Sequence, residues 1–205
     1  ESPLASATAY RVTLTNRSGV MLDSLHLGLL VQHEIGSAGA SYVATDTTRQ
    51  MAIGYKPDND DEPPYGYRIP PAFGLVVADS PAGADEAPVG MSAMRYFLNT
   101  TSGPMLDPST PEGAFHTLAG RWADGTPMRQ GGNGYGAQAG AVTTYAFAGD
   151  PVTGAFWSER NNDGSGSTSG PGQRRLIPSS GPVTLAPDAS ASWTLAVLFA
   201  QGDDY

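Results

Sequence analysis

The sequence predicts an all-β protein, an antiparallel β-sandwich of jelly-roll or immunoglobulin-like type with long Gly/Pro-rich loops. Turn-forming residues are dense, because the 205 residues include 26 glycines and 17 prolines, well above the roughly 12% of an average globular protein. Forty per cent of the chain is nevertheless apolar, with three Trp, nine Tyr and six Phe, which is enough to build a core. Several stretches also alternate apolar and polar residues, the period of a half-buried strand.

The first strands are predicted by this alternation. Tyr10, Val12 and Leu14 alternate with polar residues and stop at the turn 16–19, and a second alternating run covers 25–31. Further strands are expected at 49–55, 73–78, 93–99, 142–148 and 183–186.

The last predicted strand, 193–200, has the clearest pattern. One face carries Trp193, Leu195, Val197 and Phe199, so these side chains are expected to point into the core. About eight strands separated by Pro, Gly and Asp fit one sandwich, and we therefore predict a single domain over 1–205.

Three connections are much longer than the usual turn. They cover 56–72, 100–140 and 158–174, and loops of this length are usually functional or flexible. The second contains several large apolar residues and is expected to fold onto the sandwich as an irregular lid. Within the third, 161–172 has no apolar anchor and is expected to be the most mobile loop.

Charge and composition exclude several functions. The chain has 11 basic and 20 acidic residues, a net charge of -9, so it has no basic stripe for nucleic acid or anionic lipid. It has no Cys, which excludes disulfides, thiolate zinc sites and Cys nucleophiles. No apolar run approaches the length of a membrane span, so membrane insertion is not expected.

Catalytic motifs are also missing. His33-Glu34 does not continue into HExxH, and no G-x-S-x-G is present, so neither a metalloprotease nor a serine hydrolase site is predicted. Asp124, Asp150 and Glu159 are available as a glycosidase acid pair, but acidic residues in turns are common. We therefore expect that the protein is not an enzyme.

A calcium ion is the one cofactor that the sequence suggests. The run 58–62 (DNDDE) is rich in carboxylates, and Ca²⁺ prefers six to eight oxygen ligands. Asp58, Asp60 and Asp61 are the candidate ligands. The alternative is that they lie in solvated turns and cap their own backbone. Residues 159–163 loosely imitate the start of an EF-hand loop, but Gly170 replaces its closing Glu.

Five stretches, in order, resemble a β-rich ectodomain of large secreted or surface proteins of Bacteroidota-like bacteria, which carry a C-terminal type IX secretion sorting domain. They are SYVATDTTRQMAIGYKPDNDD (41–61), YGYRIPPAFG (65–74), GRWADGTPMRQGGNGYG (120–136), FAGDPVTGAFWSE (147–159) and PGQRRLIPSSGPVTLAPDASASWTLAVLFAQG (171–202). The resemblance implies an extracellular or cell-surface location. It also adds Asp46 to the implied ion ligands, while only Glu34 keeps the family's acidic pattern after the second strand.

Two functions remain open. The first is a structural or adhesive surface module that associates with itself, as a filament or surface-layer subunit, or with the cell envelope. Residues 1–9 (ESPLASATA) are expected to form an unanchored arm that pairs with a neighbour's sheet edge.

The second function is a carbohydrate-binding module. Tyr65, Tyr67, Trp122, Tyr135 and Trp157 lie in or beside the long loops, where exposed rings can stack on sugars. The alternative is that these rings anchor the loops to the sheets.

Overall fold

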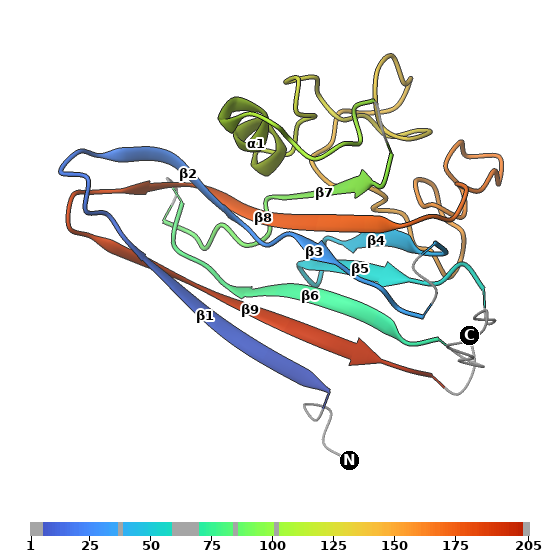
Figure 1. The fold of residues 1–205 in the computed structure, drawn as a ribbon, viewed down its shortest axis with the longest axis horizontal. Coiled ribbons are helices and arrows are strands. Elements are labelled where there is room, and N and C mark those ends of the chain that lie inside the picture. Colours follow the sequence, from blue (N-terminus) through green and yellow to red (C-terminus); the bar gives the residue numbers. More distant parts are fainter. Residues whose placement is uncertain (1–5, 37–38, 59–69, 84–85, 101–102, 203–205) are drawn as a thin grey trace.

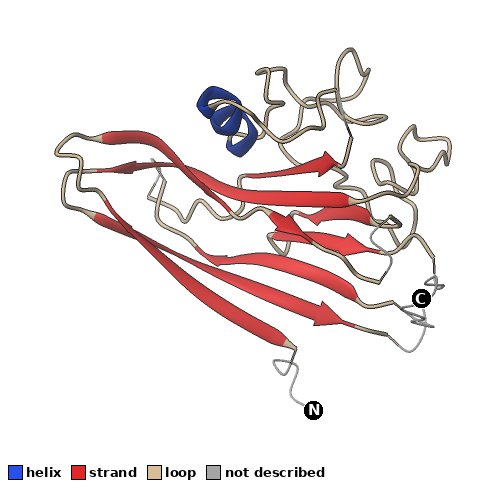
Figure 2. Cartoon of the chain, viewed as in Figure 1, coloured by secondary structure: helices blue, strands red, loops and turns tan. Residues whose placement is uncertain are grey.

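Two antiparallel β-sheets pack face to face in the computed structural model (Figure 1). The structure describes residues 6–36, 39–58, 70–83, 86–100 and 103–202. Nearly all of the regular structure is strand, with one short helix above the second sheet (Figure 2). The prediction of an all-β sandwich is confirmed.

Sheet A has five strands and sheet B is built around one long strand. The order in sheet A is β1 (Ala7–Thr15), β9 (Ser190–Ala200), β6 (Ala72–Asp79), β5 (Met51–Tyr55) and β4 (Tyr42–Asp46). In sheet B, β8 (Arg174–Leu185) pairs on one side with β2 (Leu22–Gly28) and β3 (Val31–Gln32) and on the other with β7 (Ala93–Leu98).

Alternating side chains of the strands build the part of the core that lies between the sheets, and the same buried cluster includes Trp122 and Trp157 of the loop segments. Trp193 on β9 is fully buried, and its Nε1 donates to Ser180 Oγ of β8 at 3.1 Å. Leu195 is buried on the same face, whereas Phe199, at the far end of that face, is 53% exposed. The period-2 prediction for the last strand is therefore correct for its buried half, and the strand begins three residues earlier than predicted.

Three strand predictions need correction. The predicted strand 142–148 forms only isolated bridges, from Val142 to Arg129 and from Tyr145 to Met94, and Phe147 has a φ of 49°, which ends an extended run. The predicted strand 25–31 is interrupted between β2 and β3. Finally, the predicted strand 183–186 is only the end of β8, which begins at position 174 and ends at position 185.

The segment 100–140 was predicted to be irregular, but it contains the helix α1 (Pro111–Leu118). Thr110 caps the helix by accepting a hydrogen bond from Gly113 N, and Pro111 occupies the first turn, where its missing N–H costs nothing. The segment 103–157 contributes α1 and several turns that lie over sheet B (Figure 1).

The polar loop 161–172 is anchored, contrary to expectation. Asp163 accepts hydrogen bonds from the backbone and hydroxyls of Ser165 and Ser167. Gly132 N donates to Asn162 O at 2.7 Å, which ties the loop to the segment above sheet B. Its mobility stays a prediction.

Candidate functional site

Two of the four predicted calcium ligands, Asp46 and Asp58, lie in the part of the chain that the structure describes, and the calcium site stays a prediction. Asp46 Oδ1 accepts a hydrogen bond from Arg49 N at 2.9 Å, and its Oδ2 pairs with Arg49 Nη1 at 2.6 Å, so this carboxylate closes the β4–β5 turn. Asp58 is exposed, while Asp60 and Asp61 lie outside the described residues. No group of three or more His, Asp or Glu in the described ranges is arranged to hold a metal.

Two of the predicted sugar-binding rings are buried. Trp122 and Trp157 are each 1% exposed, and their indole N–H groups donate to Gly134 O and Gly132 O, both at 3.0 Å. The guanidinium of the buried Arg95 lies 3.5 Å from the centre of the Trp122 ring. Neither indole offers the exposed face that sugar stacking requires, so both rings are anchors of the Gly-rich segment.

Tyr135 is the one predicted ring that the structure leaves half-exposed. Its hydroxyl donates to Asp124 Oδ2 at 2.7 Å, and its ring meets Trp122 edge to face at 5.5 Å. Tyr65 and Tyr67 lie outside the described residues. The three described rings, Trp122, Tyr135 and Trp157, therefore do not form a common exposed platform.

A buried ion pair at the edge of sheet A was missed by the sequence analysis. Glu159 Oε1 accepts hydrogen bonds from Arg174 Nε and Nη2 at 3.1 and 2.8 Å, and its Oε2 accepts one from Val43 N at 2.6 Å. Both side chains are almost fully buried. Burial raises the pKa of Glu159, and the Arg174 guanidinium opposes that shift.

The ion pair forms one wall of a polar cavity of about 650 Å³. Five amide or hydroxyl side chains line the cavity besides the pair, together with loop glycines and a proline and with residues of β7 and position 147. The polar lining residues besides the pair are Asn133, Gln138, Asn162, Thr168 and Ser169.

The candidate glycosidase acids do not share a site in this arrangement. Glu159 is held by Arg174, Asp124 is held by Tyr135, and Asp150 is exposed and accepts a hydrogen bond from Val152 N. Each carboxylate therefore has a local structural partner.

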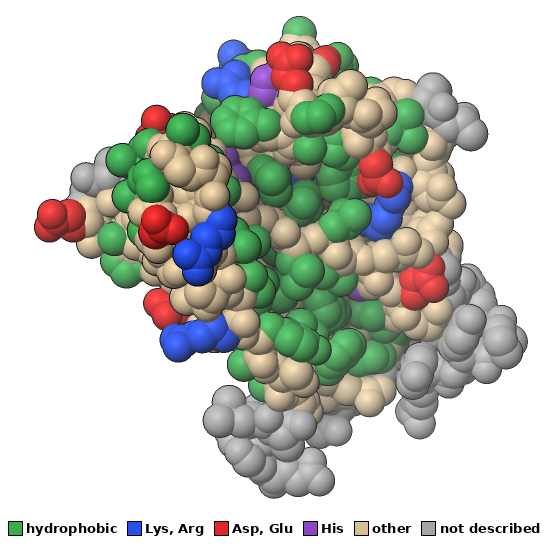
Figure 3. Space-filling view, turned by 60° about the vertical axis from the view of Figure 1, so that its left-hand side comes forward, with side chains coloured by type: hydrophobic (Ala, Val, Ile, Leu, Met, Phe, Trp, Pro, Cys, Tyr) green, Lys and Arg blue, Asp and Glu red, His purple; other side chains and the backbone are tan. Residues whose placement is uncertain are grey.

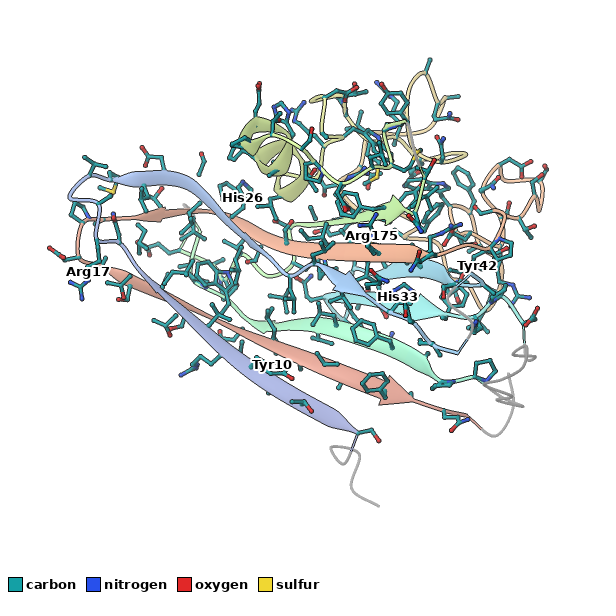
Figure 4. The ribbon with its side chains drawn as sticks, viewed as in Figure 1. Tyr10, Arg17, His26, His33, Tyr42 and Arg175 are labelled. Atoms are coloured by element: carbon teal, nitrogen blue, oxygen red, sulfur yellow. The ribbon has the colours of Figure 1, made fainter. Side chains whose placement is uncertain are left out.

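His33 is buried rather than available at a surface. Its ring is 5% exposed and stacks on Phe73 with an interplanar angle of 7°. Figure 4 shows His33 within the sandwich. Burial lowers the pKa of His33 to about 4, and the charges of Arg174 and Lys56 act in the same direction. Its neighbour Glu34 is exposed, so the two do not form half of a metal site.

One edge of sheet A is open. In the pairing of β1 with β9, Ala7 faces Leu198. Two hydrogen bonds just outside β1 continue this register, and both involve even-numbered residues of the first strand: Phe199 N donates to Ser6 O, and Asn16 N donates to Ala189 O. Because antiparallel hydrogen bonds alternate, the even-numbered residues of β1 bond to β9. The odd-numbered residues turn their N–H and C=O groups away from β9, and no described residue bonds to them from that side. They are Ala7, Ala9, Arg11, Thr13 and Thr15.

The opposite edge of sheet A is covered. Along β4, Ser41 N donates to Gly172 O, Val43 N to Glu159 Oε2, and Thr45 N to Phe147 O. In sheet B, loop carbonyls accept from Met94 N and Leu98 N along β7. The opposite edge of sheet B is irregular, because β2 has two register shifts in its pairing with β8 and β3 has only two residues. Bulges and short strands blunt an edge, so β1 is the long regular edge within the described residues.

The side chains of β1 are compatible with a close neighbour. Arg11 is its one charged residue, and its guanidinium lies 3.8 Å from Asp79 of β6, which draws it across β9 and away from the open edge. Tyr10 lies on the core-facing side of the strand but is 53% exposed; Figure 4 labels it on β1. Figure 3 shows a band of hydrophobic surface through the middle of its view, with charged side chains mostly to either side.

Comparisons with protein-family models, curated proteins and solved structures give no match to this chain. The fold defines the class as an all-β sandwich, and β1 is an open sheet edge within the described residues. Within the described residues, no helix has the length and apolar character needed to cross a membrane.

Proposed function

We propose that this protein is a non-catalytic structural module that associates with other copies of itself through the open edge of β1. The observation that carries the proposal is the contrast between the two edges of sheet A. Loops cover β4, whereas β1 presents five residues whose outward backbone groups have no described partner. A long regular strand edge of this kind is a template for pairing with another chain.

The usual protective devices are absent from β1. The strand contains no Pro, its pairing with β9 has no register shift, and its single charged side chain is directed toward Asp79. It also carries no acidic residue, in a chain of net charge -9, so two copies that approach along this edge keep carboxylates away from the contact.

The position of the pairing segment differs from the sequence prediction. Residues 7–9 of the predicted free arm belong to β1 and pair with residues 196–198 of β9, while residues 1–5 lie outside the described chain. The module is therefore proposed to associate through its edge strand. An extracellular or cell-surface location, and an adhesive role toward the cell envelope, are proposed from the sequence resemblance.

A proline at an outward-facing position tests this function. In Ala9→Pro the outward N–H is lost and the ring occupies the neighbour's path, while the hydrogen bonds to β9 are kept. The matched control Ala9→Thr keeps the N–H. Sedimentation velocity should show concentration-dependent association of the wild type and of Ala9→Thr, with Ala9→Pro weakened at least about tenfold, or about 1.4 kcal/mol.

Two results contradict the proposal. One is a wild-type protein that stays monomeric up to about 1 mM, which corresponds to less than about 4 kcal/mol of binding. The other is a well-folded Ala9→Pro variant that associates as strongly as Ala9→Thr.

Carbohydrate binding is a second candidate, and the polar cavity beside Glu159 and Arg174 favours it. The two charges neutralise each other, and the amide and hydroxyl groups of the lining match the hydrogen-bonding groups of a neutral sugar. Trp157 donates to Gly132 O, and Gly132 lines this cavity, so its fluorescence is a suitable reporter. Titration with neutral polysaccharides should shift the emission, and a flat response at saturating concentrations rejects this candidate.

A further inference from the structure

The geometry points to a specific dimer: β1 pairs antiparallel with β1 of a second copy about a two-fold axis at Tyr10. The two five-stranded sheets then form one continuous sheet. This inference rests on the proposed self-association and adds its partner strand, direction and register.

The hydrogen bonds limit the possible registers. The outward N–H and C=O groups belong to the odd-numbered residues of β1, so an odd residue must face an odd residue of the partner. A two-fold axis therefore lies either at an odd residue, which faces its own copy in a hydrogen-bonded pair, or at an even residue, which faces its copy in a non-hydrogen-bonded pair.

Charge disfavours the register centred on Arg11. That register places two guanidinium-bearing residues directly opposite each other, which is destabilising. With the axis at Tyr10, Arg11 faces the partner's Ala9, and Ala7 faces the partner's Thr13. The Arg11–Asp79 ion pair of each copy is then preserved without a like charge across the new edge.

Packing favours Tyr10 over the other odd and even positions, because only an axis at Tyr10 places this ring opposite its own copy. Tyr10 is the largest side chain of β1 and is 53% exposed. At a non-hydrogen-bonded pair the facing side chains come closest, and aromatic cross-strand pairs are favourable. An axis at Val12 instead turns Tyr10 toward the partner's Leu14, a side chain that already packs into the core beneath Trp193. An axis at Thr8 shifts most of the pairing beyond the start of β1.

This arrangement closes on itself. In an isologous contact each copy uses the same surface, so pairing consumes the open edge of both strands and stops at two. The filament or surface layer expected from the sequence would then need a second interface. Pairing through β1 would form the dimers, and the second interface would join these dimers to one another.

Single-cysteine variants test the register cleanly, because the chain has no Cys. Under mild oxidation, Tyr10→Cys should form disulfide dimers at least about tenfold faster than Arg11→Cys or the exposed control Val152→Cys, since only the first pair approaches disulfide geometry. A mixture of Thr8→Cys and Val12→Cys keeps Tyr10 intact and should give the mixed dimer in preference to either homodimer.

The outcomes separate the register from the function. If the wild type associates but Arg11→Cys cross-links fastest, the proposed register is wrong and self-association stands. The same conclusion follows if the mixture of Thr8→Cys and Val12→Cys prefers homodimers. If the wild type associates but no cysteine variant of β1 forms disulfide dimers faster than Val152→Cys, the β1 edge is not the interface. A wild type that stays monomeric removes the proposed function as well.

Discussion

Burial of His33 makes the stability of the protein depend on pH between about 4 and 6.5. The ring is enclosed by the sandwich and stacked on Phe73, and its pKa in the folded protein is about 4, against 6.5 for the model compound. Between these values the unfolded chain binds a proton that the folded chain rejects. The free energy of unfolding therefore rises with pH across this window, and stability is lost as the pH falls from about 6.5 to about 4.

The size of the effect follows from the shift. A difference of about two and a half pKa units, at about 1.4 kcal/mol for each, corresponds to about 3 kcal/mol between pH 7 and pH 4. This is a large share of the 5–15 kcal/mol that holds a typical domain together. His33→Phe is the matched variant, because it keeps a flat ring against Phe73 and removes the titration.

Urea unfolding at several pH values between 4 and 7.5, followed by tryptophan fluorescence, measures this directly. Carboxylates titrate in both proteins, so the informative quantity is the wild-type stability minus that of His33→Phe. This difference should fall by about 3 kcal/mol as the pH is lowered from 7 to 4. A difference that does not change with pH, in two folded proteins, contradicts the buried neutral histidine.

The remaining predictions concern the buried ion pair and the core. Glu159→Gln leaves the Arg174 guanidinium buried without a counter-charge and should cost about 3–5 kcal/mol in urea unfolding; a loss below about 1 kcal/mol means that water reaches the pair. Trp193→Ala removes a fully buried ring and should cost about 3–5 kcal/mol, whereas a loss under about 0.5 kcal/mol is typical of an exposed residue and contradicts the register of β9.

Alternating sequence patterns predicted β1 and β9 because each of these strands has one face toward the core. Tyr10, Val12 and Leu14 alternate because β1 has a core side and an open side, and the same holds for Trp193 and Leu195 of β9. Such strands keep the period of two that water and core impose on a pleated chain. The amino-acid sequence therefore predicts such strands without information about which strands they pair with.

Sequence patterns missed one strand that is buried on both faces, one ion pair between distant residues and one helix. In β4, the residues Tyr42 to Thr45 are all buried, so no alternation marks the strand. The pairing of Glu159 with Arg174 joins the two ends of a polar loop, and the sequence shows that loop only as Gly- and Ser-rich. The helix α1 had a local signal, Thr110-Pro111-Glu112, that matches a capped start.

The same buried pair supplies one of the three contacts that cover the β4 edge of sheet A. Glu159 accepts the outward N–H of Val43 on β4, and Arg174 holds the carboxylate in place from the first residue of β8. Burying two charges is costly unless their hydrogen bonds are satisfied, and here that arrangement helps to close one sheet edge. No comparable cover lies over β1 in the described chain, although its outward backbone groups are equally able to bond. This contrast between a covered edge and a regular edge with an exposed tyrosine and a single charged residue is the basis of the proposed pairing through β1.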